Sequence, residues 1–470
     1  MPSALTSRLE ALQTSGGFSS PLIAAFGAFL ENAPEEELFR TSPLRYAEKS
    51  GISEREAVDL FLHATRIGIL EFNWGVLCPG CMGFMTTAGG LRELSRTRHC
   101  SLCRVDVPVS IDDSVEVAFT VAPATRRIRF HDSEKLDLNR DVFKLFFSSS
   151  MQLNDEFSRH VLASVKATDR VPADGTLDLS VLLEPRSYVL LAPELHSVLH
   201  FDAVADGPSE LEVDLHDGRA IPATAQVKAG KVRLRVRNRT LRKTPLVVFA
   251  DPVPPPEARG QNFRPPMRTL LPYLSGRKLI TNQTFTDLFR SESIPAEGGL
   301  DLKDLTVLFT DLKGSTAMYE RIGDLRAYDL VRRHFGVLRD IVSKRGGAVV
   351  KTIGDAIMAS FSDSAAAMDA AVVMNREVRG VGPDLLLKIG IHSGPCIAVE
   401  LNERLDYFGQ TVNLAARVQN LAHADEIVVT EPVFAAPGVA ELVGRAGLKL
   451  AREKAHLKGI GAATAVVRLK

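Results

Sequence analysis

Two aspartates in the last third of the chain stand where a phosphoryl-transfer site needs carboxylates. Asp311 closes the apolar run LTVLFTD and is followed at once by the small-residue turn LKGST. Asp355 follows Gly354 between the runs VVKTI and AIMASF. The first pattern predicts a buried strand that leads into a helix, and the second predicts a hairpin. If the hairpin lies beside the strand, the two carboxylates converge on one pocket. Two divalent cations held there could stabilise the attacking and leaving oxygens of an in-line displacement at phosphorus.

The turn after Asp311 offers a second part of such a site. Gly314, Ser315 and Thr316 stand where the predicted helix begins. The free backbone N–H groups of a helix start would face phosphate oxygens. The sequence therefore predicts metal binding and phosphate binding at the same strand end.

Three motifs in this region resemble those of the class III adenylate/guanylate cyclase catalytic domain. They are FTDLKGST, KTIGDA and LDYFGQTVNLAARV, and they follow one another at about the usual intervals. The resemblance covers Leu302 to Lys470. It implies that Asp311, Asp355 and the carbonyl of Leu312 hold two divalent ions per active site, either Mg²⁺ or Mn²⁺.

The same resemblance assigns residues to the nucleotide. Lys351 would donate to N1 of adenine, and Asp406 would accept from the adenine amino group. Guanine presents the reverse pattern on that edge, and guanylate cyclases generally carry Glu at the lysine position, so this pair favours ATP. Asn413 would orient the ribose. Arg417 would stabilise charge on the α-phosphate, a task that suits an always ionised, forked donor.

The resemblance also implies a partner. Lys458, in HLKGIG, would grip the terminal phosphates, although the family usually has a second lysine or a polar residue where this chain has Ile460. In this family the metal aspartates come from one subunit, and the base-reading and transition-state residues come from the other. Because one chain holds the full set, the resemblance implies a head-to-tail homodimer with two equivalent sites and an inactive monomer.

We therefore expect an adenylate cyclase that converts ATP to 3′,5′-cyclic AMP and pyrophosphate, with an N-terminal regulatory region. No side chain stands out as a general base for the 3′-hydroxyl. None is required when a bound metal ion lowers the pKa of that hydroxyl. One alternative is a guanylate cyclase. Another is a catalytically silent nucleotide-sensing regulator whose N-terminal region binds DNA or protein. Any one of these residues alone would more often be structural, because such turns are common and an arginine on a helix is usually a solvated charge.

Four of the five cysteines form two CxxC knuckles separated by eighteen residues. They are Cys78, Cys81, Cys100 and Cys103. Each pair can present two thiolates to one tetrahedral ion, as in a zinc ribbon, and four protein ligands leave no open position for catalysis. We therefore expect one structural Zn²⁺ per chain. Two disulfides or redox thiols are the alternative. The fifth cysteine, Cys396, is most simply a small buried apolar residue.

The composition is that of an ordinary globular protein, with 45% hydrophobic and 24% charged residues. A net charge of zero and a pI of about 7.2 give no global attraction to nucleic acid or to anionic membranes, which argues weakly against both partners. No apolar run reaches the length of a spanning helix, and the start MPSALTSRLEALQ lacks the layout of a signal peptide. These features predict a cytoplasmic protein.

The pattern along the 470 residues predicts a multidomain chain. We expect a helical, winged-helix-like segment over 1–75, a zinc ribbon over 76–112, a mainly β, sandwich-like domain over 113–251, a proline-rich linker that could include a transducing segment over 252–300, and a nucleotide cyclase domain over 301–470. In the last domain, the order strand 305–310, helix 315–343, strands 348–353 and 356–361, helix 365–379 and strand 385–392 is the βαββαβ order of an α+β ferredoxin-like palm.

Two N-terminal features leave more than one interpretation. Ser53 and Glu56 form a capping box before an amphipathic helix, and the helix, turn, helix, strand order there is of the winged-helix kind. The second helix carries Glu54, Glu56 and Asp59 against Arg55 and Arg66, which is a poor face for phosphates. A packing or dimerisation role is therefore the alternative to DNA binding. A single amphipathic helix is also expected near 141–165.

Overall fold

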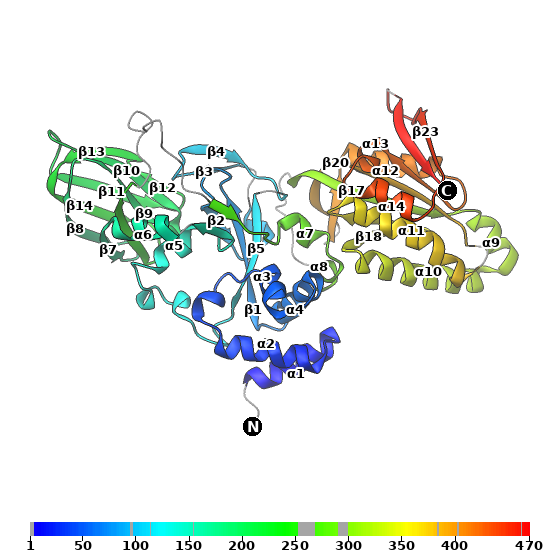
Figure 1. The fold of residues 1–470 in the computed structure, drawn as a ribbon, viewed down its shortest axis with the longest axis horizontal. Coiled ribbons are helices and arrows are strands. Elements are labelled where there is room, and N and C mark those ends of the chain that lie inside the picture. Colours follow the sequence, from blue (N-terminus) through cyan, green and yellow to red (C-terminus); the bar gives the residue numbers. More distant parts are fainter. Residues whose placement is uncertain are drawn as a thin grey trace. The chain divides into compact units, whose positions relative to one another are not determined.

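The computed structural model describes residues 4–94, 97–112, 114–153, 155–251, 268–289, 299–382, 385–401, 404–461 and 463–470. The chain forms two compact units (Figure 1). Unit 1 comprises Met1–Gly90, Leu94–Val109 and Ser114–Leu274, and unit 2 comprises Leu91–Glu93, Ser110–Asp113 and Ser275–Lys470. The five-part division expected from the sequence is finer than this and stays a prediction.

Unit 1 begins with four helices and a small sheet. The helices are α1 (Ala4–Gly16), α2 (Ser20–Asn32), α3 (Pro43–Ser50) and α4 (Glu54–Arg66), and the sheet has the order β2 (Phe84–Ala88), β1 (Leu70–Leu77), β5 (Val115–Val121). Ser53 Oγ accepts from the Glu56 N–H at 3.2 Å, so the predicted cap starts α4. The order α3, α4, β1 follows the predicted helix, helix, strand order, and strands from three predicted segments share this one sheet.

A two-stranded hairpin follows, formed by β3 (Thr97–Cys100) and β4 (Val105–Pro108). The helix expected near 141–165 is wrong: two short helices, α5 (Asp141–Phe146) and α6 (Asp155–Ala163), flank the strand β6 (Met151–Leu153), which pairs with β16 (Arg268–Leu270). The run Ser148–Ser150 lies between α5 and β6, and two of its hydroxyls donate to the buried carboxylate of Glu116. Those contacts favour an extended chain over a continuous helix.

The rest of unit 1 is β structure. One sheet has the order β13-β10-β9-β15-β7 and the other the order β12-β11-β14-β8. The strands are β7 (Val165–Val171), β8 (Thr176–Leu183), β9 (Ser187–Ala192), β10 (Ser197–Val204), β11 (Glu210–His216), β12 (Arg219–Ile221), β13 (Thr224–Lys228), β14 (Gly230–Asn238) and β15 (Thr244–Ala250). Alternate residues of both sheets, such as Leu190, Leu199, Val213 and Leu234, meet in one buried cluster. The region is therefore β-rich, as expected.

Unit 2 is built on a sheet with the order β18-β19-β17-β20-β22-β24-β23, with β21 paired to β20. The strands are β17 (Leu300–Leu312), β18 (Gly347–Ile353), β19 (Ala356–Phe361), β20 (Leu387–Leu401), β21 (Arg404–Phe408), β22 (Glu426–Thr430), β23 (Leu450–Ala455) and β24 (Thr464–Leu469). The helices are α7 (Gly276–Ile280), α8 (Gln283–Leu288), α9 (Ser315–Ile322), α10 (Asp324–Lys344), α11 (Ser364–Val381), α12 (Gln410–Leu421), α13 (Glu431–Phe434) and α14 (Val439–Arg445).

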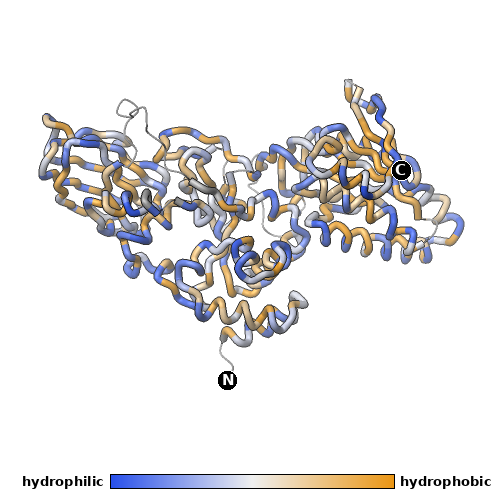
Figure 2. Tube along the Cα trace, viewed as in Figure 1, coloured by the Kyte–Doolittle hydropathy of each residue, from blue (hydrophilic) through white to orange (hydrophobic). Residues whose placement is uncertain are grey.

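Helices cover both faces of this sheet. Residues of α10 and α11 share a core with Ile427 and Val429 of β22, whereas α12 packs with Val428, the residue between them. Because neighbouring strand residues point to opposite faces, α12 lies on the face opposite α10 and α11. This double cover explains why the run Leu305–Thr310 is buried at every position. Figure 2 shows hydrophobic and hydrophilic residues alternating along α10, as a helix with one buried face requires.

The βαββαβ order is present over residues 300–401, with one correction. The single helix expected over 315–343 is two helices, because the chain breaks at Gly323, whose φ of 77° is not a helical conformation.

Two short helices of unit 2 precede the sheet in sequence and pack on it. Gln283 Oε1, on α8, accepts from the Val349 N–H of β18 at 2.8 Å. The hydroxyl of Tyr407, on β21, donates to the carbonyl of Ile280 at 3.3 Å. The proline-rich part of the expected linker, 252–267, and residues 290–298 lie outside the described residues. No described helix combines the length and the apolar character that crossing a bilayer requires.

Candidate active site and cysteine cluster

The strand register brings Asp311 and Asp355 to the same end of the sheet. β17 and β19 are antiparallel neighbours, and the Ile357 N–H of β19 donates to Thr310 Oγ1 of β17 at 3.2 Å. Asp311 is the next residue of β17. Asp355 is in the two-residue turn between β18 and β19, where Gly354 supplies a φ of 62°. The predicted hairpin therefore exists, and it places the second carboxylate beside the first strand.

One carboxylate oxygen of this pair has no hydrogen-bond partner among the described residues. It is Asp355 Oδ2, and it is buried. A carboxylate oxygen removed from water without a partner is costly, and a divalent cation is a partner that oxygen ligands suit. The two aspartates therefore fit a metal of the Mg²⁺ or Mn²⁺ kind. Leu312 has no side-chain ligand atom and its side chain is buried, so only its backbone carbonyl could join them.

The sequence did not single out Lys388, which the structure places at this site. Lys388 of β20 lies opposite Asp311 in the antiparallel register, and its Nζ donates to Asp311 Oδ2 at 2.7 Å. Both side chains are mostly shielded from solvent, at 19% and 31% exposed. A fixed positive charge therefore lies beside the carboxylate. The only signal in the sequence is one lysine in the apolar run LLLKIGI.

The two residues expected to read the base lie together. Lys351 Nζ, on β18, donates to Asp406 Oδ2, on β21, at 2.6 Å. The other oxygen, Asp406 Oδ1, accepts from the Tyr407 N–H at 2.8 Å. Asp406 is 7% exposed and Lys351 is 39% exposed. The carboxylate is thus held on both oxygens, and the lysine side chain still reaches solvent.

Asn413 and Arg417 lie on one face of α12, because they are four residues apart. Asn413 is exposed and Arg417 is half-buried. The Arg417 guanidinium lies over Gly459, where an added Cβ would be 3.2 Å from Nη1. A side chain at that position would displace the guanidinium. Lys458 is the neighbour of Gly459 in this loop and is exposed.

The turn after Asp311 leads into a helix, as the sequence predicted. Gly314 adopts a φ of 72° immediately before α9, and Ser315 and Thr316 start that helix. A residue with a side chain would be strained at position 314. The N–H groups of this first turn are free of helical partners, as in any helix start.

The four cysteines of the CxxC pairs meet in unit 1. Their sulfurs lie within 4.8 Å of one another. Cys78 Sγ is 3.8 Å from Cys103 Sγ, and Cys81 Sγ is 3.7 Å from Cys100 Sγ. A tetrahedral ion with metal–sulfur bonds of about 2.3 Å requires sulfurs about 3.8 Å apart, so the cluster could hold one metal ion. All four are free thiols here.

The fifth cysteine, Cys396, lies in unit 2. Burial raises the pKa of the Cys396 thiol to about 12, which fits an inert, apolar role.

The second knuckle is anchored on the β-rich part of unit 1, which the sequence did not indicate. Ser101 Oγ donates to the carbonyl of His196 at 3.0 Å, and the His200 ring is 3.1 Å from the carbonyl of Leu102. His196 is buried, and burial lowers its pKa to about 3. A metal at the cysteines would therefore also fix this contact between the hairpin and the β strands.

Comparison with known proteins divides the chain into two regions. Residues 3–287 match a family described as "Family of unknown function (DUF5939)". Residues 301–461 match the "Adenylate and Guanylate cyclase catalytic domain". The chain belongs to the DUF5939 family and carries a nucleotide cyclase catalytic domain. The cyclase domain contains every predicted nucleotide-site and divalent-metal residue, and the DUF5939 region contains the cysteine cluster.

Relatives of the cyclase domain include adenylate cyclase 2 of Rhizobium meliloti, 32% identical over 130 residues, which are 24% of this chain and 36% of that protein. The adenylate cyclase of Anabaena cylindrica is 28% identical over 156 residues, 29% of this chain and 31% of that protein. The chain thus spans about a third of the length of these two relatives. Among solved structures, the adenylyl cyclase CyaB from P. aeruginosa is 22% identical, with a TM-score of 0.32, over 37% of this chain and 96% of that one.

Proposed function

We propose that the cyclase domain is an adenylate cyclase, which converts ATP to 3′,5′-cyclic AMP and pyrophosphate. The observation that carries the proposal is the pair Asp311 and Asp355 at one sheet end, with Asp355 Oδ2 buried and unpartnered in the described part of the chain. A buried carboxylate oxygen of this kind marks a place for a cation. The names of the curated relatives support the same reaction class.

The protein groups around that pair have separate tasks. Asp311 and Asp355 hold two divalent cations, and Lys388 keeps the Asp311 carboxylate in place by its 2.7 Å hydrogen bond. When bound, the cations acidify the 3′-hydroxyl and neutralise the leaving pyrophosphate. The N–H groups at Gly314, Ser315 and Thr316 face the phosphates.

Two residues of α12 and one loop lysine hold the reacting part of the substrate. Arg417 places a permanent charge with directed donors against the α-phosphate, where negative charge grows in the transition state. Asn413 orients the ribose so that its 3′-oxygen is in line with the α-phosphate. Lys458 contacts the terminal phosphates, on the same side of the domain as the Arg417 guanidinium.

Base choice rests on the Lys351–Asp406 pair. Lys351 Nζ donates to adenine N1, and Asp406 accepts from the 6-amino group. For guanine, the lysine would face an N–H donor and the aspartate a carbonyl acceptor. Because unpaired buried polar groups are costly, the pair disfavours GTP.

We further propose that the active form is a head-to-tail homodimer. Ile353, at the end of β18 next to the Asp355 turn, is 50% exposed, and Phe408, at the end of β21, is 47% exposed. Large apolar side chains exposed beside a polar site are typical of a surface that a partner covers. In this arrangement one subunit supplies the metal aspartates, and the other supplies Lys351, Asp406, Asn413 and Arg417.

The cysteine cluster is proposed to hold one structural Zn²⁺ per chain. The sulfur spacing supports a tetrahedral ion, and four protein ligands leave no position for a substrate.

The direct test of the enzyme proposal is product formation by the full chain. With ATP and Mg²⁺ or Mn²⁺, we expect cyclic AMP, and we expect none from Asp311→Ala. In a competition between ATP and GTP, we expect cyclic AMP to dominate. The absence of both cyclic nucleotides from a folded, dimeric protein would overturn the proposal, and cyclic GMP as the main product would overturn the base assignment.

A further inference from the structure

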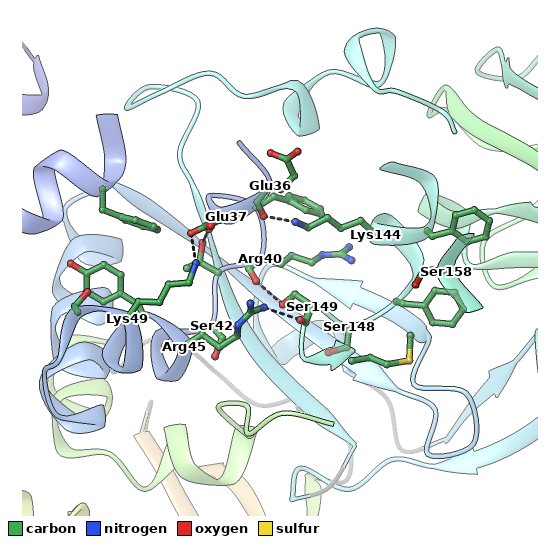
Figure 3. A pocket seen from close by; sticks show the side chains of 18 of the residues that line it. Glu36, Glu37, Arg40, Ser42, Arg45, Lys49, Lys144, Ser148, Ser149 and Ser158 are labelled. Carbon is green, nitrogen blue, oxygen red and sulfur yellow. Dashed lines mark hydrogen bonds and ion pairs between the residues drawn. The ribbon is translucent and has the colours of Figure 1, made fainter. Parts of the chain in front are cut away.

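A pocket in unit 1 has no part in the cyclase chemistry. Its volume is about 430 Å³. It is lined by α2, by the segment that leads into α3, by α3 itself, by the stretch from α5 to β6 and by Ser158 of α6 (Figure 3). All of these elements lie inside the region that matches DUF5939. The volume is in the range of small-molecule sites and far larger than an inorganic ion needs.

Arg40 is held in an unusual conformation in the wall of this pocket. It is 9% exposed, and its φ of 48° is rare for a residue with a side chain. The guanidinium carbon lies 4.9 and 4.5 Å from the ring centres of Phe39 and Phe84. Ser149 Oγ donates to the Arg40 carbonyl at 3.0 Å. Strained backbone that the surrounding contacts maintain is often found at ligand sites.

The Arg40 side chain keeps an unused donor. Nη1 donates to the carbonyl of Leu145 at 2.8 Å, but Nε is buried without a hydrogen-bond partner among the described residues. Burial lowers the pKa of Arg40 to about 10, so the group is still charged at neutral pH. Ser42 Oγ, in the same wall, is also buried and unpartnered within the described ranges, and this residue is 4% exposed.

Two more cations face the pocket and meet only neutral acceptors. Arg45 Nη1 donates to the carbonyl of Ser149 at 3.1 Å, and Lys144 Nζ donates to the carbonyl of Glu36 at 2.5 Å. In the part of the chain that the structure describes, no ion pair joins Arg40, Arg45 or Lys144 to a carboxylate.

The two glutamates of the pocket wall pair with other cations, one of which, Lys49, lines the same pocket. The Glu37 carboxylate pairs with Lys49 at 2.7 Å, and the Glu36 carboxylate pairs with Arg129 at 3.0 Å. The carboxylates of Glu116 and Glu194 are near enough to favour the charged form of Arg40, but in the described residues neither is hydrogen-bonded to it. A shielded cation without a directly bonded counter-charge is costly, and an anion in the pocket would offset that cost.

The rest of the wall is largely apolar. The aromatic and thioether side chains that line it are Phe29, Phe39, Tyr46, Phe143, Phe147 and Met151. An apolar pocket with a few convergent polar groups is the usual form of a site for an organic ligand.

We propose that this pocket binds a small organic anion, with a carboxylate or phosphate head and an apolar or aromatic body. The head lies against Arg40, Arg45 and Lys144. The planar, forked guanidinium groups match both kinds of oxyanion, and the lysine adds a point charge. Ser42 donates a further hydrogen bond, and the body packs on the aromatic side chains. This gives the DUF5939 region a ligand-binding activity that is separate from the cyclase site.

The test uses direct binding to the full chain, in the absence of nucleotide and divalent ions. Phenyl phosphate and benzoate are the two anionic probes, and benzyl alcohol is the neutral probe of similar size. Isothermal titration gives the affinity. Hydrogen exchange locates the site, with slower exchange expected in residues 36–50 and 143–151. Arg45→Gln and Lys144→Met remove pocket charges. Arg235→Gln is the control: it removes a half-buried charge of β14, in the same unit but not among the residues that line the pocket.

We expect one or both anionic probes to bind one per chain, at least about tenfold more tightly than benzyl alcohol. Arg45→Gln or Lys144→Met should weaken that binding at least about tenfold, and Arg235→Gln should change it less than about twofold. Binding of phenyl phosphate alone assigns a phosphate head, and binding of benzoate alone assigns a carboxylate head. The proposal is overturned if neither anion binds, if the neutral probe binds equally well, or if slower exchange in the parent protein occurs only in unit 2.

Discussion

Replacing His334 with leucine should make the free energy of unfolding of the cyclase domain less sensitive to acid. His334 lies on α10 and is 0% exposed, and neither ring nitrogen has a hydrogen-bond partner among the described residues. Burial lowers its pKa from 6.5 to about 4. The folded domain therefore keeps this imidazole neutral, whereas the unfolded chain binds a proton near pH 6.5.

The size of the effect follows from that difference in pKa. Because the folded pKa lies below the unfolded one, the unfolded state binds more protons between them, and stability falls as the pH falls from 6.5 toward 4. The total loss is about 3.4 kcal/mol, at about 1.36 kcal/mol per pKa unit. Between pH 7.5 and pH 5 the loss is about 2 kcal/mol. His334→Leu cannot take up the proton and should lack this part of the acid sensitivity.

The assay is hydrogen exchange by mass spectrometry in increasing urea, followed on peptides of β17 and α10. These peptides report the unfolding of unit 2 separately from that of unit 1. The parent protein should lose about 2 kcal/mol more than His334→Leu between pH 7.5 and pH 5. His423→Gln, which changes an exposed histidine of the same unit, should behave as the parent does. Equal losses in the parent and in His334→Leu would refute the reasoning.

Three further outcomes are expected. Metal analysis should find one zinc per chain. Cys81→Ser should lose the zinc and lower the free energy of unfolding of unit 1 by at least about 3 kcal/mol, whereas Cys396→Ser should keep the zinc. A stable protein that contains no zinc would contradict the assignment. Arg417→Ala should lower kcat by about 100-fold to 1000-fold, while the KM for ATP changes less than about threefold. Arg404→Ala, which changes an exposed arginine, is the control. An increase in KM without a loss of kcat would count against a transition-state role. Lys351→Glu should lower the ATP-to-GTP ratio of kcat/KM by at least about 100-fold, and an unchanged ratio would remove Lys351 from base recognition.

Much of unit 2 could be predicted from the sequence because its signals are local. The apolar run before Asp311 and the Gly354-Asp355 pair each specify an element within a few residues. Lys388 could not be found in this way. Its contact with Asp311 depends on the register of two strands 77 residues apart in sequence. The sequence also did not predict the break at Gly323. Many helices continue through a glycine, so a glycine within a helical pattern does not by itself show that the helix ends there.

Unit 1 shows the same limit in a stronger form. Two CxxC pairs were enough to predict the cysteine cluster, since each pair is local and four thiolates suit one ion. The contacts of Ser101 and His200 that anchor this hairpin join residues about a hundred positions apart. The pocket is similar: the Arg45 side chain meets the carbonyl of Ser149, 104 residues away in sequence. No periodicity or motif carries that information.

The shared active site is the central claim, and a mixed dimer tests it most directly. Asp311→Ala removes a metal aspartate, and Arg417→Ala removes the transition-state arginine. Each variant alone should be nearly inactive. Co-expressed with two different tags and purified through both, the mixed dimer contains one site with neither change, because each site takes its aspartate from one subunit and its arginine from the other. It should show about half the activity of the parent dimer. A mixed dimer as inactive as either variant alone, or full activity in a monomeric parent protein, would contradict the account.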